Sequence, residues 1–309
     1  MVEEPGTTAP PLDLAALKAR LGRTGVWLMS IGRVPAAQER QAAIAIEQLG
    51  YRTLWFGEAA GGREALTHAA MLLCGTERLV VATGIANIFA RDAVAMANGA
   101  GGLAERWPHR FVLGLGVSHA TSVTARGHEY SRPLAAMREY LDGMDAATFA
   151  VPVAEPTPRV LAALRPGMLR LAARRAHGAH PYFVTREHTV LAREILGPDP
   201  VLAPEQAVVV ETDPERARAA ARAYAAAYLR LPNYVNNLLA LGWSERDVAD
   251  GGSDALIDAV VPWGSPEAVA EHVRAHHAAG ADHVCVQPIA DTLDQQVEHL
   301  RQLAPLLNP

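Results

Sequence analysis

The segment Leu79-Val80-Val81-Ala82-Thr83-Gly84-Ile85-Ala86-Asn87, together with Arg110-Phe111-Val112-Leu113-Gly114-Leu115-Gly116-Val117-Ser118 after a helical run, decides the fold of this chain. Both apolar runs are short and end in glycine, and a helix-length segment separates them. This order predicts a parallel β-α-β unit. Because glycine lets a ligand or a neighbouring backbone approach closely, the glycine-rich strand ends predict a ligand site.

The same alternation of strand and helix continues along most of the 309 residues. The predicted strands are 25–30, 53–56, 79–83, 111–116, 159–164, 179–184, 206–211 and 282–287. Eight strands alternating with helices predict an α/β fold, a (β/α)8 TIM barrel. Residues 232–262 are longer than one crossover requires, so we expect a helical insertion over the site, between strands 7 and 8.

The N-terminal residues form a separate unit in this prediction. Residues 1–12 contain three prolines and two glutamates, which favours a flexible leader, and Asp13 is a candidate cap for a short helix ending at Leu21. We therefore predict a leader and short helix over 1–22 and a single barrel domain over 23–309. The sequence contains neither a secretion signal nor a membrane span, which predicts a cytoplasmic protein.

The composition argues against several classes of chemistry. A net charge of -5 and 6% aromatic residues leave little from which to build a nucleic-acid surface. Lys18 is the only lysine and precedes the first predicted strand, so Schiff-base chemistry has no candidate. We expect Cys74 and Cys285 to be small buried apolar residues. His272 and His276 are four residues apart, but no third ligand accompanies them, so we expect no metal site.

Position in the barrel selects the candidate site residues, because barrel enzymes react at the C-terminal ends of their strands. A proline and a glycine at a helix start, as in Pro166-Gly167, expose backbone N–H groups suited to phosphate. The candidates by position are Ser30, Arg33, Glu58, Gly84 to Asn87, Gly116 to His119, Leu164 to Met168, Thr185, Arg186 and Gln287.

Four segments together resemble the bacterial luciferase-like flavin and deazaflavin oxidoreductases, over about residues 23–290. They are Leu54-Trp55-Phe56-Gly57-Glu58, Ala82 to Asn87, Arg110 to Val117 and Gly280-Ala281-Asp282-His283-Val284. Gly57-Glu58 before Arg63-Glu64, with Leu164 to Leu169, is most similar to the branch that uses coenzyme F420. The resemblance implies a barrel with an insertion, often a homodimer, that binds reduced F420 or FMN without a metal and acts on a small-molecule substrate.

The resemblance also implies the cofactor contacts. In that family the third strand often ends in a bulge with a non-prolyl cis peptide against the cofactor ring, and Gly84-Ile85 is the matching position. The predicted cofactor-binding residues are Gly84, Ile85, Asn87, Gly116, Val117, Arg165, Gly167 and Met168.

Two residues are candidates for acid/base catalysis. Glu58 stands where many F420-dependent members carry an acidic residue, but Ala59 replaces the histidine that often follows it. This departure leaves Glu58 or His119 as the catalytic group. The alternatives are an ordinary strand-end carboxylate for Glu58 and a solvent-facing loop residue for His119.

The choice between the two cofactors depends on the rim of the site. The acidic tail of F420 requires arginines there, for which Arg33, Arg63 and Arg186 are candidates, whereas FMN requires only a phosphate cradle. We expect hydride transfer between F420 and a small organic substrate. The alternatives are a two-component FMN-dependent monooxygenase supplied by a partner reductase, and a non-catalytic flavin-binding barrel.

Overall fold

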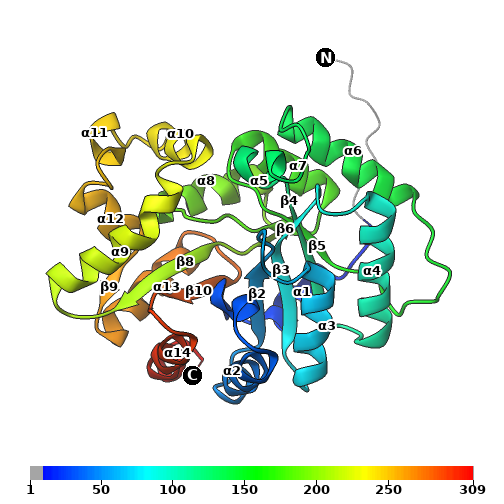
Figure 1. Ribbon diagram of the computed structural model, residues 1–309, viewed down its shortest axis with the longest axis horizontal. Helices are drawn as coiled ribbons and strands as arrows, with labels where there is room; N and C mark the ends of the chain where they lie inside the picture. Colours follow the sequence, from blue (N-terminus) through cyan, green and yellow to red (C-terminus); the bar gives the residue numbers. More distant parts are fainter. Residues whose placement is uncertain (1–9, 309) are drawn as a thin grey trace.

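The computed structural model describes residues 10–308, in which parallel strands surround the centre of the molecule and helices cover them (Figure 1). The strands are β1 (Thr24–Trp27), β2 (Thr53–Gly57), β3 (Val80–Asn87), β4 (Phe111–Gly116), β5 (Arg159–Leu161), β6 (Gly178–Ala179), β7 (Val201–Leu202), β8 (Glu205–Val210), β9 (Trp263–Gly264) and β10 (Val284–Pro288). The helices are α1 (Leu14–Leu21), η1 (Ser30–Arg33), α2 (Ala36–Gln48), α3 (Ala65–Gly75), α4 (Ala93–Arg106), α5 (Ala120–Thr124), α6 (Pro133–Ala146), α7 (Pro166–Arg175), α8 (Arg186–Leu196), α9 (Pro214–Tyr228), α10 (Pro232–Ala240), α11 (Glu245–Val248), α12 (Asp254–Val260), α13 (Pro266–Ala278) and α14 (Leu293–Leu307).

The segment 201–210 closes the sheet into a barrel. In strand order the sheet runs β7-β6-β5-β4-β3-β2-β1-β10-β8-β9. The first part of the segment 201–210, β7, pairs with β6, and the second part, β8, pairs with β10. Because Ala203 and Pro204 alone separate the halves, one continuous stretch of chain joins both sides of the sheet. The predicted (β/α)8 barrel is confirmed, and β7 and β8 together take the place of its seventh strand.

Helix α1 closes the N-terminal end of the barrel. The Asp13 side chain accepts a hydrogen bond from the Ala16 N–H, as its predicted capping role requires. Leu17 and Leu21 are buried and pack with strand residues such as Trp27 and Trp55. Both tryptophans are buried.

A bulge in β3 replaces the predicted cis peptide. The pairing of β3 with β2 shifts after Thr83, and its pairing with β4 shifts between Ala82 and Ala86. The described chain contains no cis peptide bond, so the prediction for Gly84–Ile85 is wrong. The bulge takes up the extra length with trans bonds, because the Thr83 hydroxyl bonds both the N–H and the carbonyl of Gly114. A Cβ on Gly114 would lie 1.7 Å from the Thr83 carbonyl oxygen, so this contact requires glycine.

Several predicted boundaries differ from the structure. Strand five ends at Leu161 rather than at 164, and strand six ends at Ala179 rather than at 184. The C-terminal helix α14, which no predicted element matches, packs against α2 and α13. Residues 232–262 form α10, α11 and α12, which lie beside α9 on the left of Figure 1.

Other predictions concern single residues. Cys285 is buried as predicted, but Cys74 is exposed, because its position on α3 faces outward. Residues 1–9 of the predicted leader lie outside the described residues, whereas the Pro10 carbonyl accepts a hydrogen bond from His177. No helix among residues 10–308 is long and apolar enough to span a membrane. In the same range no cluster of three metal-ligating side chains is present.

Candidate active site

A cavity of about 340 Å³ opens at the C-terminal ends of the strands. Its walls come from β3, from the segments that follow β4, β5 and β6, and from the starts of α6, α7 and α10. The lining is mostly apolar, with a few polar side chains among it. This combination is typical of a small-molecule site.

Six of the ten predicted site residues line this cavity: Ile85, Val117, His119, Arg165, Gly167 and Met168. Ile85 projects from the β3 bulge, and Val117 and His119 follow β4. Gly116 does not line the cavity, but it leaves room for Ile85, because a Cβ on Gly116 would lie 2.3 Å from the Ile85 side chain. The sequence signal of glycines at strand ends therefore located the cavity correctly.

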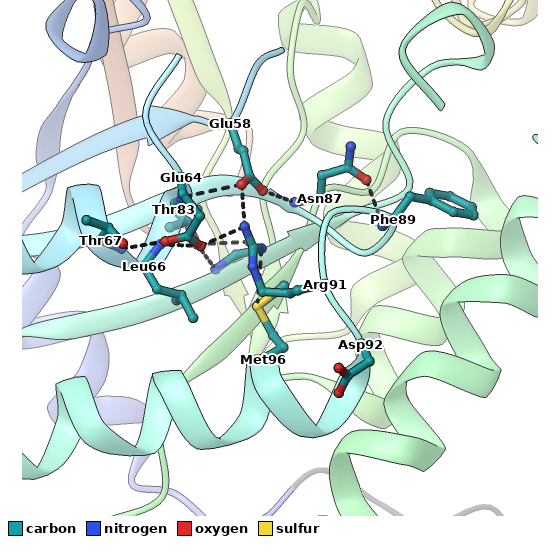
Figure 2. A network of polar contacts seen from close by, with 12 residues as sticks. Glu58, Glu64, Leu66, Thr67, Thr83, Asn87, Phe89, Arg91, Asp92 and Met96 are labelled. Atoms are coloured by element: carbon teal, nitrogen blue, oxygen red, sulfur yellow. Dashed lines mark hydrogen bonds and ion pairs between the residues drawn. The ribbon is translucent and has the colours of Figure 1, made fainter. Parts of the chain in front are cut away.

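Glu58 is not among the cavity-lining residues and instead belongs to a buried ion-pair network (Figure 2). Its carboxylate pairs with Arg91 and accepts hydrogen bonds from the N–H groups of Ala65 and Asn87, at 3.2 and 2.8 Å. Arg91 also pairs with Glu64, 2.7 Å away. These contacts tie β2 and β3 to the starts of α3 and α4. The arrangement corresponds to the structural alternative for Glu58, a strand-end carboxylate.

The other two predicted cofactor residues also lie outside the cavity lining. Asn87 uses its side-chain oxygen to accept a hydrogen bond from the Phe89 N–H at 2.9 Å. Gly84 lies where a Cβ would approach Trp27 Nε1 to 2.7 Å and His180 Nε2 to 3.0 Å. Its role is to leave space beside two buried polar side chains.

His119 lies in the cavity wall at the N-terminus of α5. Its ring is 5.7 Å, between centroids, from that of Tyr234 on α10. Burial lowers the pKa of His119 below its ordinary value of 6.5, so the ring is neutral at pH 7. A neutral imidazole in a cavity can accept a proton from a ligand.

The start of α7 offers less than the predicted phosphate cradle. The Met168 N–H donates to the Arg165 carbonyl at 3.0 Å and is not free for a ligand. One guanidinium nitrogen of Arg165 donates to the Asn236 carbonyl at 2.6 Å and holds α10 against α7. The N–H of Gly167 and the remaining donors of Arg165 are the groups suited to an anion here.

The rim arginines inferred for F420 are not part of the cavity lining. Arg63 pairs with Glu39 at 2.5 Å and donates to the Val34 carbonyl, which fixes the segment after η1. Arg186 is exposed and pairs with Glu187. The guanidinium at the cavity is that of Arg165.

His180 and Tyr182 are among the cavity residues that the prediction from strand ends does not include. Strand six was predicted to end at 184, so its functional end was assigned to Thr185 and Arg186. The strand ends at Ala179, which moves the functional end back to His180-Pro181-Tyr182. The proline within this segment was the available signal, because proline is rare inside a central strand.

His180 contributes a buried acceptor. Its Nδ1 hydrogen-bonds the Ala203 carbonyl at 2.7 Å, and burial lowers its pKa to about 4. The ring is therefore neutral with the proton on Nδ1, and Nε2 has a free lone pair. In the described structure neither His180 Nε2 nor Trp27 Nε1 has a hydrogen-bond partner. Both nitrogens lie close to Gly84, and His180 is the one of the two residues that lines the cavity.

Comparisons with known proteins agree with this fold. The sequence profile described as luciferase-like monooxygenase matches residues 18–283. A putative coenzyme F420-dependent oxidoreductase of Mycobacterium tuberculosis is 32% identical over 121 residues, which cover 39% of this chain and 35% of that protein. The match thus spans about a third of the relative's length.

Two solved structures share the fold at low sequence identity. An F420-dependent secondary alcohol dehydrogenase, in complex with an F420-acetone adduct, gives a TM-score of 0.76 at 14% identity, over 93% of this chain and 99% of that chain. The oxygenating constituent of 3,6-diketocamphane monooxygenase from Pseudomonas putida, in complex with FMN, gives 0.69 at 16% identity, over 93% and 96%.

The fold is that of a closed (β/α)8 barrel with a bulged third strand and a cavity at the C-terminal ends of its strands. The chain belongs to the luciferase-like monooxygenase family, whose profile covers most of its length. The resemblance inferred from the four sequence segments is confirmed.

Proposed function

We propose that this protein is a coenzyme F420-dependent oxidoreductase that transfers a hydride between the deazaflavin and a small organic substrate. The cavity carries the proposal. Ile85 on the β3 bulge supplies an apolar support for a flat ring, and the start of α7 lies across the same cavity. The F420-dependent relative and structural neighbour support this choice of cofactor.

The buried polar groups fit such a cofactor. A deazaflavin ring carries carbonyl oxygens and N–H groups along one edge, and His180 Nε2 in the cavity lining offers an acceptor for such an N–H group. Gly167 and Arg165 are the groups that would face its phosphate. When bound, the deazaflavin supplies the hydride, and the protein orients it and excludes water.

A side-by-side equilibrium titration of the purified protein with F420 and FMN, followed by cofactor fluorescence, tests the proposal. We expect micromolar or tighter binding of F420 and much weaker binding of FMN. The substitution Ile85→Ala removes apolar contact with the ring and should weaken F420 binding about tenfold, or ~1.4 kcal/mol. Ile195→Ala is the matched control, since Ile195 is also half-buried but lies on α8, outside the cavity lining.

The second candidate is a two-component FMN-dependent monooxygenase. The absence of Arg33, Arg63 and Arg186 from the described cavity lining favours it, because FMN has no acidic tail. The FMN-bound structural neighbour also supports it. Preferential binding of FMN, with substrate-dependent oxygen consumption once a reductase supplies reduced FMN, would replace the first proposal. Tight cofactor binding without any turnover would indicate a flavin-binding barrel.

A further inference from the structure

Glu205 is a buried carboxyl group at the start of β8 that no part of the proposed cofactor site uses. Glu205 is 1% exposed, so its carboxyl group is buried within the barrel. Its Oε2 accepts a hydrogen bond from the Phe183 N–H at 3.1 Å, and its Oε1 lies 3.4 Å from the Tyr224 hydroxyl. No cation is among the groups that set its charge state in the described structure. Burial therefore raises the pKa of Glu205 from 4.5 to about 8, and the group is neutral at pH 7.

Tyrosine hydroxyls connect Glu205 to the cavity. Tyr224 on α9 donates to the Tyr182 hydroxyl at 3.0 Å, and Tyr182 donates to Gln287 Oε1 at 2.9 Å. The Tyr228 hydroxyl, one turn after Tyr224, lies 2.8 Å from that of Tyr182. Tyr182 lines the cavity beside His180. The chain of groups thus begins at a buried acid and ends at the substrate site.

Counting donors fixes the direction of this chain. Glu205 Oε2 is occupied as an acceptor by the Phe183 N–H, so the proton of the neutral acid belongs on Oε1 and points to Tyr224. Tyr224 has one proton, and with Glu205 donating to it that proton goes to Tyr182. Glu205 and Tyr224 therefore each donate toward Tyr182, whose own proton is donated to Gln287 Oε1 and would have to turn to a substrate oxygen. The 3.4 Å contact between Glu205 and Tyr224 is the loosest link.

The groups around the chain include two that stay protonated, Tyr234 and Cys285, and the neutral ring of His180, which lines the cavity with Tyr182. Tyr234 on α10 packs on Tyr182 and Tyr228, and burial raises the pKa of Tyr234 well above 10. Burial likewise raises the pKa of the Cys285 thiol on β10, so it stays protonated. The charge of Arg33 in η1 opposes the rise that burial causes in the pKa of Tyr228.

We propose that the Glu205–Tyr224–Tyr182 chain is the proton source for the reaction in the cavity, with Tyr182 as the catalytic acid and Glu205 as the reservoir behind it. The proposal rests on the proposed function and names its substrate class, a carbonyl compound or the corresponding alcohol. In reduction, a hydride from the reduced deazaflavin forms the new C–H bond as the C=O π bond breaks. The substrate oxygen takes the Tyr182 proton.

The remaining protons then move one step each. Tyr224 reprotonates Tyr182, Glu205 reprotonates Tyr224, and Glu205 is left as a carboxylate that solvent recharges. The two electrons gained by the substrate are those lost by the cofactor, which releases its matching proton to solvent. Alcohol oxidation follows the same path in reverse and requires Glu205 as the carboxylate. The charge state of Glu205 thus links the favoured direction to pH.

Infrared difference spectroscopy of the whole protein, titrated from pH 6 to pH 10, tests the chain without a substrate. The wild type should show a protonated carboxyl band that disappears with a midpoint near 8. This band should be missing in Glu205→Gln. Should that variant not fold, loss of the band in the wild type on raising the pH is still diagnostic.

Two tyrosine variants test the coupling with opposite signs. Tyr224→Phe removes a hydrogen bond to the carboxylate and should raise the midpoint. Tyr182→Phe frees the Tyr224 proton to bond the carboxylate and should lower it. Tyr140→Phe is the control, because the Tyr140 hydroxyl bonds the Arg91 carbonyl and lies outside the chain. It should leave the midpoint unchanged.

The results separate this proposal from the cofactor assignment. A carboxyl group already ionised at pH 7, or a midpoint that Tyr182→Phe does not move, would overturn the proton chain even if F420 binds. Conversely, the expected midpoint shifts in a protein that fails to bind F420 would preserve the chain as a proton source and overturn the cofactor assignment alone.

Discussion

Glu58 and Glu205 are both buried carboxyl groups at strand termini, and their surroundings give them opposite properties. Glu58 is held by the Arg91 guanidinium and two backbone N–H groups (Figure 2). Glu205 receives one backbone N–H and faces a tyrosine, with no cation among the groups that set its charge state in the described structure. Burial of a carboxylate is costly unless it is paired, so the first stays a charged clamp and the second becomes a neutral acid.

The comparison shows that burial alone does not define an acid/base group. The sequence places Glu58 in the conspicuous position, after a glycine at a strand end. The structure directs its oxygens to Arg91 and to backbone, away from the cavity lining. Glu205 has no such motif, yet tyrosines link it to the cavity. Partners, more than position, decide which carboxyl group can exchange protons.

The largest expected effect is the pH dependence of stability caused by Glu205. The folded chain keeps this proton up to pH 8, whereas the unfolded chain loses it near 4.5, so stability falls as the pH rises through this window. Relative to Glu205→Gln, the wild type should lose on the order of 4 kcal/mol of unfolding free energy between pH 5 and pH 9. Urea denaturation at several pH values measures this difference.

Comparison with the variant is essential because other groups titrate in the opposite sense. Burial lowers the pKa values of His180, His276 and His283 to about 4, so these histidines destabilise the fold as the pH falls from 6.5 to 4. Their contribution cancels in the difference between wild type and Glu205→Gln. A difference that does not change with pH would mean that Glu205 is charged in the folded protein.

The ion pair between Glu58 and Arg91, which we call the clamp, should give the next largest effect on stability. Arg91→Met leaves the Glu58 carboxylate buried without its cation, which should cost about 3 kcal/mol of unfolding free energy. We choose the lower end of the usual range because 11% of the Arg91 side chain is exposed. Arg78→Met is the control, since the Arg78–Glu77 pair is solvent-exposed and should contribute little. Equal losses in both variants would contradict the clamp.

The rate of catalysis should depend on the tyrosines that connect Glu205 to the cavity. Tyr182→Phe should slow hydride transfer about hundredfold, the loss of one positioned acid and ~2.7 kcal/mol of barrier lowering. Stopped-flow oxidation of the reduced cofactor measures the rate once a carbonyl substrate is found. Tyr140→Phe, which removes a hydroxyl beside the clamp, should leave the rate unchanged. Equal rates for Tyr182→Phe and the wild type would remove Tyr182 as the acid.

The smallest effect separates the clamp from the helix that follows it. Asp92 caps α4 by accepting a hydrogen bond from the Ala95 N–H at 2.8 Å. Asp92→Ala should cost about 1 kcal/mol, the usual value of an N-cap, with no change in cofactor affinity. If thermal unfolding shows a loss as large as that of Arg91→Met, the helix start rather than the ion pair holds this corner of the barrel.

Much of the site could be predicted from local patterns. Ile85, Val117 and Gly167 were identified because glycines and prolines mark strand and helix ends, and these ends face the cavity. Tyr182 is missed because Tyr182-Phe183-Val184 continue a strand-like pattern beyond Ala179, and Pro181 is the one local signal that the strand has already ended. The trans bulge of β3 was also invisible, since its geometry depends on the Thr83 hydroxyl reaching Gly114 on the next strand.

The sequence by itself determined the alternation of strands and helices, the barrel class, the family and the end of the barrel at which the cavity opens. These features follow from periodicity and from turn residues, which act over a few positions. The tertiary structure alone decided that 201–210 closes the ring, that Arg91 pairs with Glu58, and that tyrosines from α9 and from the segment after β6 connect Glu205 to the cavity. The charge state of a buried group depends on partners distant in sequence, and only folding brings them within hydrogen-bonding distance.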